Sequence, residues 1–199
     1  MQQPIVISGA GILGCYISCA LSLQGIDSIV LEKKDDEVED SVRTITLNPF
    51  SKNLLDKIGI ENDYSMINKM EVKDFDGTGK IVFKSREIGM DHLAYVSDFA
   101  TLLMAVRKKA SEKILYKEEI IDIDNKGDFN KVTLSSGKVI KTNLIISSDG
   151  KNSKLANKIP KSDKDYFQTA LTFLASAEKN MNMSAFQVFS DNGICAVSY

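Results

Sequence analysis

Tryptophan is absent from the 199 residues, histidine occurs once, and cysteine and proline occur three times each. The three cysteines have no metal-type spacing, so we expect no metal site. Cys15 and Cys19 lie one helical turn apart, where a small hydrophobic residue would serve as well. All three cysteines, Cys195 included, are therefore predicted to be reduced packing residues rather than redox residues.

The chain also lacks an excess of charge and a long uninterrupted apolar run. A formal net charge of -2 gives no electrostatic reason to expect nucleic acid. No stretch is apolar enough to span a bilayer, and the apolar N-terminal region lacks the positively charged start of a signal peptide. We expect a cytoplasmic protein, with peripheral contact to the inner membrane as an alternative.

A strand, a glycine turn and a helix are predicted at the start of the chain. Residues 4–8 form a short apolar run, typical of a strand buried in a parallel sheet, and residues 12–24 have helical apolar spacing. A second buried strand over 28–31 leads to Glu32, about 20 residues after the turn. This βαβ pattern predicts a dinucleotide site.

Each part of that site has a physical basis. The three glycines permit a tight turn, a close approach of pyrophosphate and close packing of helix on sheet. The pyrophosphate is expected at the helix N-terminus, along the backbone of Gly9, Ala10, Gly11, Ile12, Leu13 and Gly14. Glu32, with Lys33 beside it, is expected at the ribose, where a carboxylate argues against NADP. A glycine turn without a ligand is the alternative.

The rest of the pattern is mixed. Helices are predicted over 49–59 and 98–110, and a hairpin over 70–76 and 80–84 around an Asp-Gly-Thr-Gly turn suggests an inserted second sheet. Further strands are predicted over 114–123, 131–135, 139–140, 144–146, 168–177 and 185–190, with one more starting at Gly193.

A second motif follows the strand at 144–146. It reads Ser148-Asp149-Gly150-Lys151-Asn152-Ser153. With it, the whole chain resembles the N-terminal half of the flavin-dependent aromatic hydroxylases, most closely those of ubiquinone biosynthesis. The segments that carry this resemblance are the glycine turn with Glu32, the segment Asp40-Ser41-Val42-Arg43-Thr44-Ile45-Thr46-Leu47, Tyr95-Val96 before a helix with Leu102, the Asp-Gly motif, and residues 185–197.

The resemblance implies an α/β fold like that of para-hydroxybenzoate hydroxylase. A Rossmann-type FAD-binding domain would comprise residues 1–68 and 95–160, and a partial mixed β-sheet substrate domain residues 69–94 and 161–199. By resemblance, Arg43 would reach the pyrophosphate or ribityl part of FAD, and the backbone near Ile120 would meet the adenine. Asp149 and Gly150 would serve FAD and the docking of NAD(P)H.

The resemblance further implies a monooxygenase that uses FAD, NAD(P)H and O₂ to hydroxylate a phenolic, polyprenylated substrate. The cofactor would supply the chemistry, so no catalytic side chain is nominated, and His92 is expected to be a surface or packing residue. Three departures stand out: the family's Gly-Asp motif would lie beyond residue 199, and Ala100 and Ala156 stand where relatives often have polar residues.

Three functions remain open at this point. The chain could be a hydroxylase completed by a separate C-terminal chain or by other quinone-pathway proteins. It could instead be a truncated, non-catalytic remnant or half of a split flavoprotein that binds at most the ADP part of FAD. A prenyl reductase or halogenase is a third possibility, and the absence of tryptophan weakens the halogenase alternative.

Overall fold

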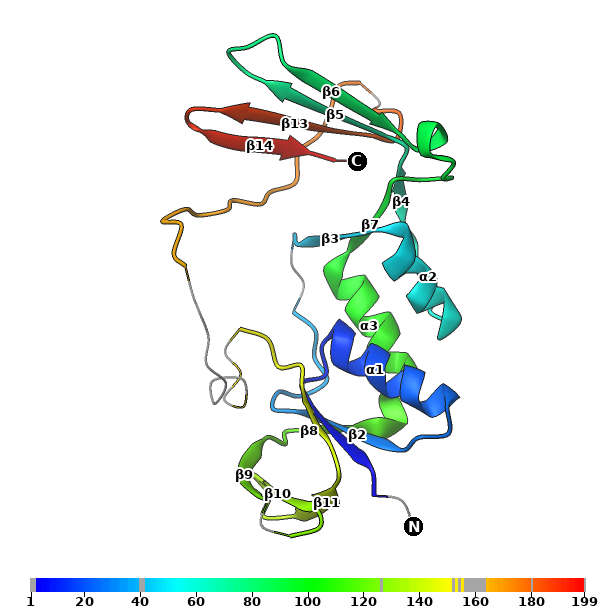
Figure 1. Ribbon diagram of the computed structural model, residues 1–199, viewed down its shortest axis with the longest axis vertical. Coiled ribbons are helices and arrows are strands. Elements are labelled where there is room, and N and C mark those ends of the chain that lie inside the picture. The colour runs from blue at the N-terminus through cyan, green and yellow to red at the C-terminus, as the bar shows by residue number, and fades with distance from the viewer. Residues whose placement is uncertain are drawn as a thin grey trace. The chain divides into compact units, whose positions relative to one another are not determined.

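The computed structural model describes residues 3–39, 42–125, 127–151, 153, 155, 164–179 and 181–198. The chain divides into two compact units. The first comprises Met1–Asp40 and Leu102–Ala170, and the second Ser41–Thr101 and Leu171–Tyr199. Figure 1 shows the elements of both, coloured along the chain.

The first unit is built on a four-stranded sheet. Its order is β12 (Ile145–Ser147), β1 (Ile5–Ser8), β2 (Ser28–Glu32) and β8 (Ile114–Tyr116), and every pair is parallel. Helix α1 (Ile12–Leu23) connects β1 to β2. This confirms the predicted βαβ unit. β1 is a central strand, with β2 on one side and β12 on the other, and its Val6 and Ile7 side chains are fully buried.

A three-stranded antiparallel sheet completes the core of this unit. It contains β9 (Ile120–Asp124), β10 (Asn130–Leu134) and β11 (Val139–Thr142). The strand predicted over 114–123 is wrong as a single element: it is two strands, because the chain takes a left-handed conformation at Lys117, with φ 58°. One cluster of buried core side chains consists of Val6, Leu31, Ile120, Val132, Leu134 and Ile140.

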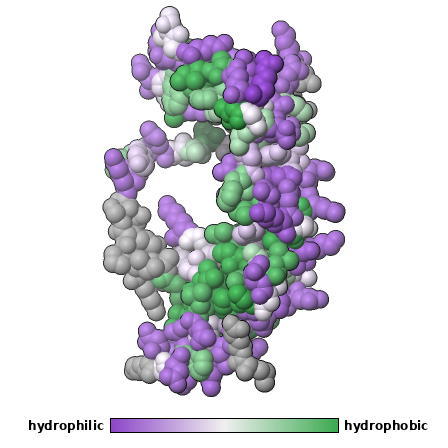
Figure 2. Space-filling view, turned by 45° about the vertical axis from the view of Figure 1, so that its right-hand side comes forward, coloured by the Kyte–Doolittle hydropathy of each residue, from purple (hydrophilic) through white to green (hydrophobic). Residues whose placement is uncertain are grey.

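Helix α3 (Phe99–Lys109) and the short helix η2 (Ser111–Lys113) precede β8. Val106 and Leu102 of α3 are fully buried, as the predicted apolar spacing requires. Apolar side chains also reach the surface of this unit, and they include Leu13 and Leu23 of α1 and Met104 of α3. In the view of Figure 2, the largest group of apolar residues lies in the lower part.

The second unit contains a sheet that the sequence did not predict. Strands β3 (Thr44–Leu47) and β4 (Ser65–Ile67) each pair antiparallel with β7 (Ala94–Asp98). Helix α2 (Pro49–Lys57) lies between β3 and β4 in the sequence, and the Asn48 side chain accepts a hydrogen bond from the Ser51 backbone N–H at 2.7 Å. That contact caps the helix, and Pro49 fits its first turn.

A mixed four-stranded sheet is the other part of the second unit. The predicted hairpin is present as β5 (Lys69–Asp74) and β6 (Lys80–Lys84), followed by the short helix η1 (Ser85–Ile88). Strand β13 (Ser184–Ser190) pairs parallel with β5, and β14 (Gly193–Val197) pairs antiparallel with β13. The strands predicted at 185–190 and from Gly193 are thus confirmed.

Two other expectations are wrong. Residues 168–177 form no strand, and their apolar side chains, such as Leu171 and Phe173, are largely exposed, because no neighbouring strand pairs with them. Cys195 is exposed on β14 and is not a packing residue, whereas Cys15 and Cys19 are buried. In the part of the chain that the structure describes, no helix is both long and apolar enough to cross a membrane.

Candidate nucleotide-binding site

The glycine turn after β1 is shaped by close backbone contacts. Gly9 has φ 99°, and a Cβ atom there would lie 2.7 Å from the Asp149 Cα. A Cβ at Gly14 would collide with the Gly9 carbonyl oxygen. These two positions therefore require glycine for the fold of the turn itself, independently of any ligand.

Gly11 differs from its two neighbours in the motif. It has φ −74°, an ordinary value, and a Cβ built there would meet no atom within 4 Å. It is the N-cap of α1, with no side chain capping the helix and no acidic residue in its first turn. Open space thus lies beside Gly11 at the N-terminus of α1, and a helix N-terminus, with its unpaired backbone N–H groups, favours an anion.

Glu32 ends β2 beside this turn. Its Oε2 accepts a hydrogen bond from the Ala10 backbone N–H at 3.0 Å, and its Oε1 accepts one from the Lys34 backbone N–H at 3.1 Å. The carboxylate also faces Arg107 of α3, whose Nη2 lies 3.4 Å from Oε2. The structure therefore brings the predicted ribose residue next to the predicted pyrophosphate loop.

Arg107 was not predicted as part of this site. Its Nε donates to the Ala10 carbonyl oxygen at 2.9 Å, so the residue contacts both Glu32 and the glycine turn. No local motif marks it, because 75 residues separate it from Glu32. The one available signal was the scarcity of arginine, since only three of the 25 basic residues are arginines.

The Asp-Gly motif after β12 lies against the glycine turn. Parallel pairing of β12 with β1 sets this position, and the Ser148 hydroxyl donates to the carbonyl oxygens of Ser8 and Gly9 at 2.8 and 3.0 Å. The Asp149 carboxylate accepts a hydrogen bond from the Ser147 hydroxyl at 2.7 Å. Gly150 has φ 76° and open space around it.

Comparison with known protein families identifies the family of this chain. The profile of the family described as "FAD binding domain" matches residues 2–189. The chain belongs to that family. The site residues fit the cofactor. The turn requires glycine at Gly9 and Gly14, Gly11 leaves room at the helix N-terminus, and the acceptor carboxylate of Glu32 lies alongside.

Among curated proteins, this FAD-binding domain is 27% identical over 224 residues to the mitochondrial ubiquinone biosynthesis monooxygenase COQ6 of Danio rerio, covering 97% of the chain and 46% of that protein. It is 24% identical to the 3-demethoxyubiquinol 3-hydroxylase of Escherichia coli, covering 96% of the chain and 54% of that protein. The chain thus spans about half the length of these relatives.

Solved structures show the same fold. PqsL of Pseudomonas aeruginosa superposes with a TM-score of 0.69 at 19% identity, over 83% of this chain and 48% of that one. The p-nitrophenol 4-monooxygenase PnpA of Pseudomonas putida superposes with a TM-score of 0.64 at 17% identity, over 79% and 43%. The predicted class, an α/β Rossmann-type fold with a mixed β-sheet, is confirmed.

The remaining predicted site residues are distributed over both units of the chain. Arg43 belongs to the second unit, where its guanidinium lies 4.1 Å from the centre of the Phe99 ring. The Ile120 side chain is part of the hydrophobic core, and Lys33 is exposed. Ala100 is buried, and its methyl side chain has no polar atom. Roles for Arg43, Lys33 and the backbone at Ile120 stay predictions.

Some motif residues lie outside the described part of the chain. They are Asp40, Ser41, Asn152 and Ala156. His92, by contrast, is half-buried in the second unit, where its Nδ1 hydrogen-bonds to the Asn68 side chain and its ring packs edge-on against Tyr95. These contacts agree with the expected packing role.

A buried thiol lies near the site. Burial raises the pKa of Cys15 to about 12, although the nearby Arg107 charge opposes that shift. The thiol therefore stays protonated at neutral pH and is a poor nucleophile. Cys15 is thus a buried packing residue of α1, as predicted, and adds no chemistry to the candidate nucleotide site.

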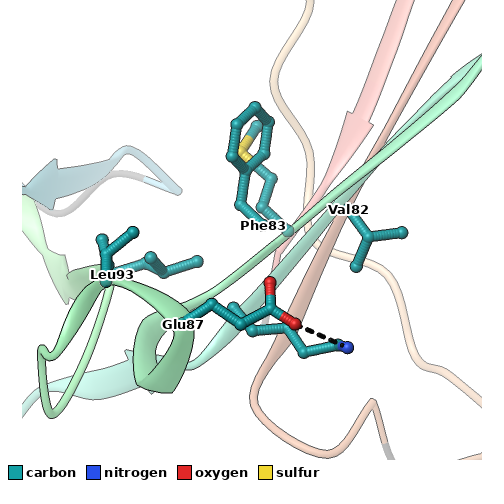
Figure 3. A pocket seen from close by; sticks show the side chains of 7 residues that line it. Val82, Phe83, Glu87 and Leu93 are labelled. Atoms are coloured by element: carbon teal, nitrogen blue, oxygen red, sulfur yellow. Dashed lines mark hydrogen bonds and ion pairs between the residues drawn. The ribbon is translucent and has the colours of Figure 1, made fainter.

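The second unit has an apolar pocket of about 220 Å³ next to β6 and η1. In Figure 3 the Phe83 and Leu93 side chains stand beside it, and the Glu87–Lys84 ion pair lies at its edge. The volume is below the roughly 300 Å³ at which sites for small molecules usually begin. We therefore assign no ligand to this pocket.

Proposed function

We propose that this chain binds FAD and forms the FAD-binding part of a monooxygenase that hydroxylates an aromatic ring in ubiquinone biosynthesis. The observation that carries the proposal is the open space over Gly11 at the start of α1, with the Glu32 carboxylate and Asp149 beside the same turn. The relatives named for ubiquinone biosynthesis support the reaction and the pathway.

In this proposal the backbone from Gly9 to Gly14 holds the pyrophosphate, and Glu32 with Lys33 receives the adenosine ribose. Arg43 reaches the pyrophosphate or ribityl chain, the backbone near Ile120 meets the adenine, and Asp149 with Gly150 contacts FAD and the docking NAD(P)H. The flavin supplies the oxygen chemistry when it is bound, reduced by NAD(P)H and oxidised by O₂. The protein supplies binding, orientation and the exclusion of water.

The substrate follows from the same relatives. We infer that the substrate is a phenolic quinone precursor with a polyprenyl tail, and that the protein is cytoplasmic, with at most peripheral contact to the inner membrane. We also infer an FAD-binding domain of residues 1–68 and 95–160 and a substrate domain of residues 69–94 and 161–199.

Flavin fluorescence quenching tests the proposal directly. The purified chain is titrated with FAD, and we expect micromolar binding. Gly11→Ala should bind FAD at least about tenfold more weakly with an unchanged melting temperature, since its methyl group enters open space where the pyrophosphate would lie. Gly127→Ala, in the turn between β9 and β10, is the matched control because its Cβ also meets no atom within 4 Å.

Two outcomes would contradict the proposal. Absence of binding up to millimolar FAD by the wild-type chain would remove FAD as its ligand. Equal affinities of wild type and Gly11→Ala would show that the pyrophosphate does not lie over this turn. Binding that behaves as expected leads to an NAD(P)H oxidation assay with a phenolic substrate.

One observation favours a narrower function as the second candidate. The glycine turn, Glu32, Arg107 and Asp149 all belong to the first unit, whereas Arg43 belongs to the second. The first unit could then hold the ADP part of FAD without a complete flavin site. Competition separates the two functions: if only the ADP part is held, ADP displaces FAD with equal affinity and FMN does not compete.

A further inference from the structure

The Glu32 carboxylate is already partly occupied by the protein. A carboxylate has about four acceptor positions on its two oxygens. Oε2 faces two donors, the Ala10 N–H at 3.0 Å and Arg107 Nη2 at 3.4 Å, while Oε1 accepts only from the Lys34 N–H at 3.1 Å among the contacts of the described chain. One acceptor position on Oε1 is therefore left for a ligand.

Arg107 controls this arrangement from α3. Its side chain is 11% exposed and that of Glu32 is 12% exposed, so both charges are largely removed from water. Its Nε holds the Ala10 carbonyl oxygen, and its guanidinium carbon lies 5.8 Å from the centre of the Tyr116 ring. Two hydrogen bonds thus hold the Ala10 backbone: its N–H donates to Glu32, and its carbonyl oxygen accepts from Arg107.

Stability alone does not account for this pair. Burying an ion pair usually brings little net stability, because desolvation offsets the attraction. The cost is higher here because Nη1 of Arg107 is buried and has no hydrogen-bond partner in the described part of the chain. The geometry also has a direct effect at the turn: Arg107 keeps the Ala10 carbonyl oxygen occupied and balances the negative charge of Glu32 next to an anion site.

We propose that Arg107 is a positioning residue for nucleotide binding: it fixes Glu32 through Oε2, so that Oε1 is presented to a hydroxyl of the adenosine ribose. The inference rests on the proposed FAD function, since it assigns the ribose to Glu32. Arg107 itself touches Glu32 and the turn, and it acts through them.

The test compares two nucleotides on each variant. Isothermal titration calorimetry measures the affinities of ADP and of 2′,3′-dideoxyADP, which lacks both ribose hydroxyls. The wild-type chain should prefer ADP by about tenfold or more, the usual worth of a hydrogen bond to a charged group. In Arg107→Met and Arg107→Lys the preference should fall to within about twofold, while the affinity for the dideoxy nucleotide changes little.

The variants are chosen to separate positioning from folding. A general loosening of the site would lower the affinities of both nucleotides together and leave the ratio of the two affinities unchanged. Arg107→Lys keeps the charge and the aliphatic stem but not the fork that reaches both Ala10 and Glu32, so it carries the comparison if Arg107→Met does not fold. Lys108→Met, an exposed neighbour on α3, is the matched control and should keep the wild-type ratio.

Each contrary result has a distinct meaning. A wild-type ratio in both Arg107 variants would overturn the inference and leave the proposed function standing. Wild-type binding of ADP without preference over the dideoxy nucleotide would show that Glu32 does not receive the ribose, which also overturns the inference. No binding of either nucleotide by the wild-type chain would overturn the proposed function and, with it, this inference.

Discussion

Glu71 of β5 is a buried carboxylate surrounded by positive charge. It forms ion pairs with Lys69, Lys73 and Lys80 at 3.0, 2.9 and 3.1 Å. Hydrogen bonds from Lys73 first, and then from Lys69 and Lys80, lower the pKa of Glu71 from 4.5 to about 2. Because the pKa is lowered in the folded state, the ionised group stabilises the fold above pH 4.5 and this stabilisation is lost as the pH falls towards 2.

Glu71→Gln should therefore change the pH dependence of unfolding. The wild-type free energy of unfolding should fall between pH 4.5 and 2, and the variant should show a flatter slope there. At neutral pH the variant should be less stable, because three lysines lose their shared counter-charge. Urea unfolding across this pH range checks the prediction.

The exposed ion pair of Glu87 with Lys84 provides the control, since such pairs contribute little. Glu87→Gln should keep the wild-type slope. Identical slopes for wild type and Glu71→Gln would contradict the role assigned to the three lysines.

Some residues of the candidate nucleotide site could be predicted from the sequence and one could not, and the difference is how far along the chain their partners lie. Gly9, Gly11, Gly14 and Glu32 were predictable, because one βαβ unit contains the whole motif and each glycine has a local reason. Arg107 was not, because its contact with Glu32 depends on where α3 packs. The motif also assigns different roles to two of its glycines, and their surroundings differ: the fold requires glycine at Gly9, whereas Gly11 borders open space.

At the scale of elements, the start of α3 depends on a cap. The Asp98 carboxylate accepts a hydrogen bond from the Thr101 backbone N–H at 2.7 Å, and this bond lowers the pKa of Asp98. Asp98→Ala should reduce the free energy of unfolding by about 1 kcal/mol, the usual worth of such a cap. Asp98→Asn should retain most of it, since asparagine also accepts through Oδ1.

Urea unfolding at pH 7 compares the two variants. Equal losses in Asp98→Ala and Asp98→Asn would show that charge at the helix N-terminus matters and the hydrogen bond does not. Wild-type stability in both would contradict a capping role altogether.

The elements that could be predicted have strong local signals. β1, α1 and β2 follow from apolar spacing and glycine turns, and the β5–β6 hairpin follows from its turn residues. The sheet of β3, β4 and β7 was missed because its strands are short and pair across long stretches, as Thr44 does with Asp98. The prediction of a strand over 168–177 is wrong because an apolar segment forms a strand only where a neighbouring strand pairs with it.

For the molecule as a whole, the mixed sheet presents an edge. β14 is the outer strand of the order β14-β13-β5-β6, and its five residues are exposed. An exposed apolar edge strand pairs readily with other chains. The isolated protein should therefore associate as its concentration rises, and Ile194→Lys on β14 should reduce this association.

Analytical ultracentrifugation over a concentration series measures the effect. Leu23→Lys is the matched control, because Leu23 and Ile194 are both 63% exposed but Leu23 ends a helix. Equal association of the two variants would show that general surface hydrophobicity, and not the edge of β14, drives the contact.

The position of β1 between β2 and β12 has a consequence for the order of events during synthesis. Its second neighbour is translated late, since the Ser148 hydroxyl that binds the Ser8 carbonyl lies 140 residues further on. At a synthesis rate of roughly 5–20 residues per second, one edge of β1 stays unpaired for about 7–30 s. The Ser148 hydroxyl can reach the Gly9 carbonyl oxygen only then, so under the proposed function the turn is complete for a nucleotide only after Ser148 has left the ribosome.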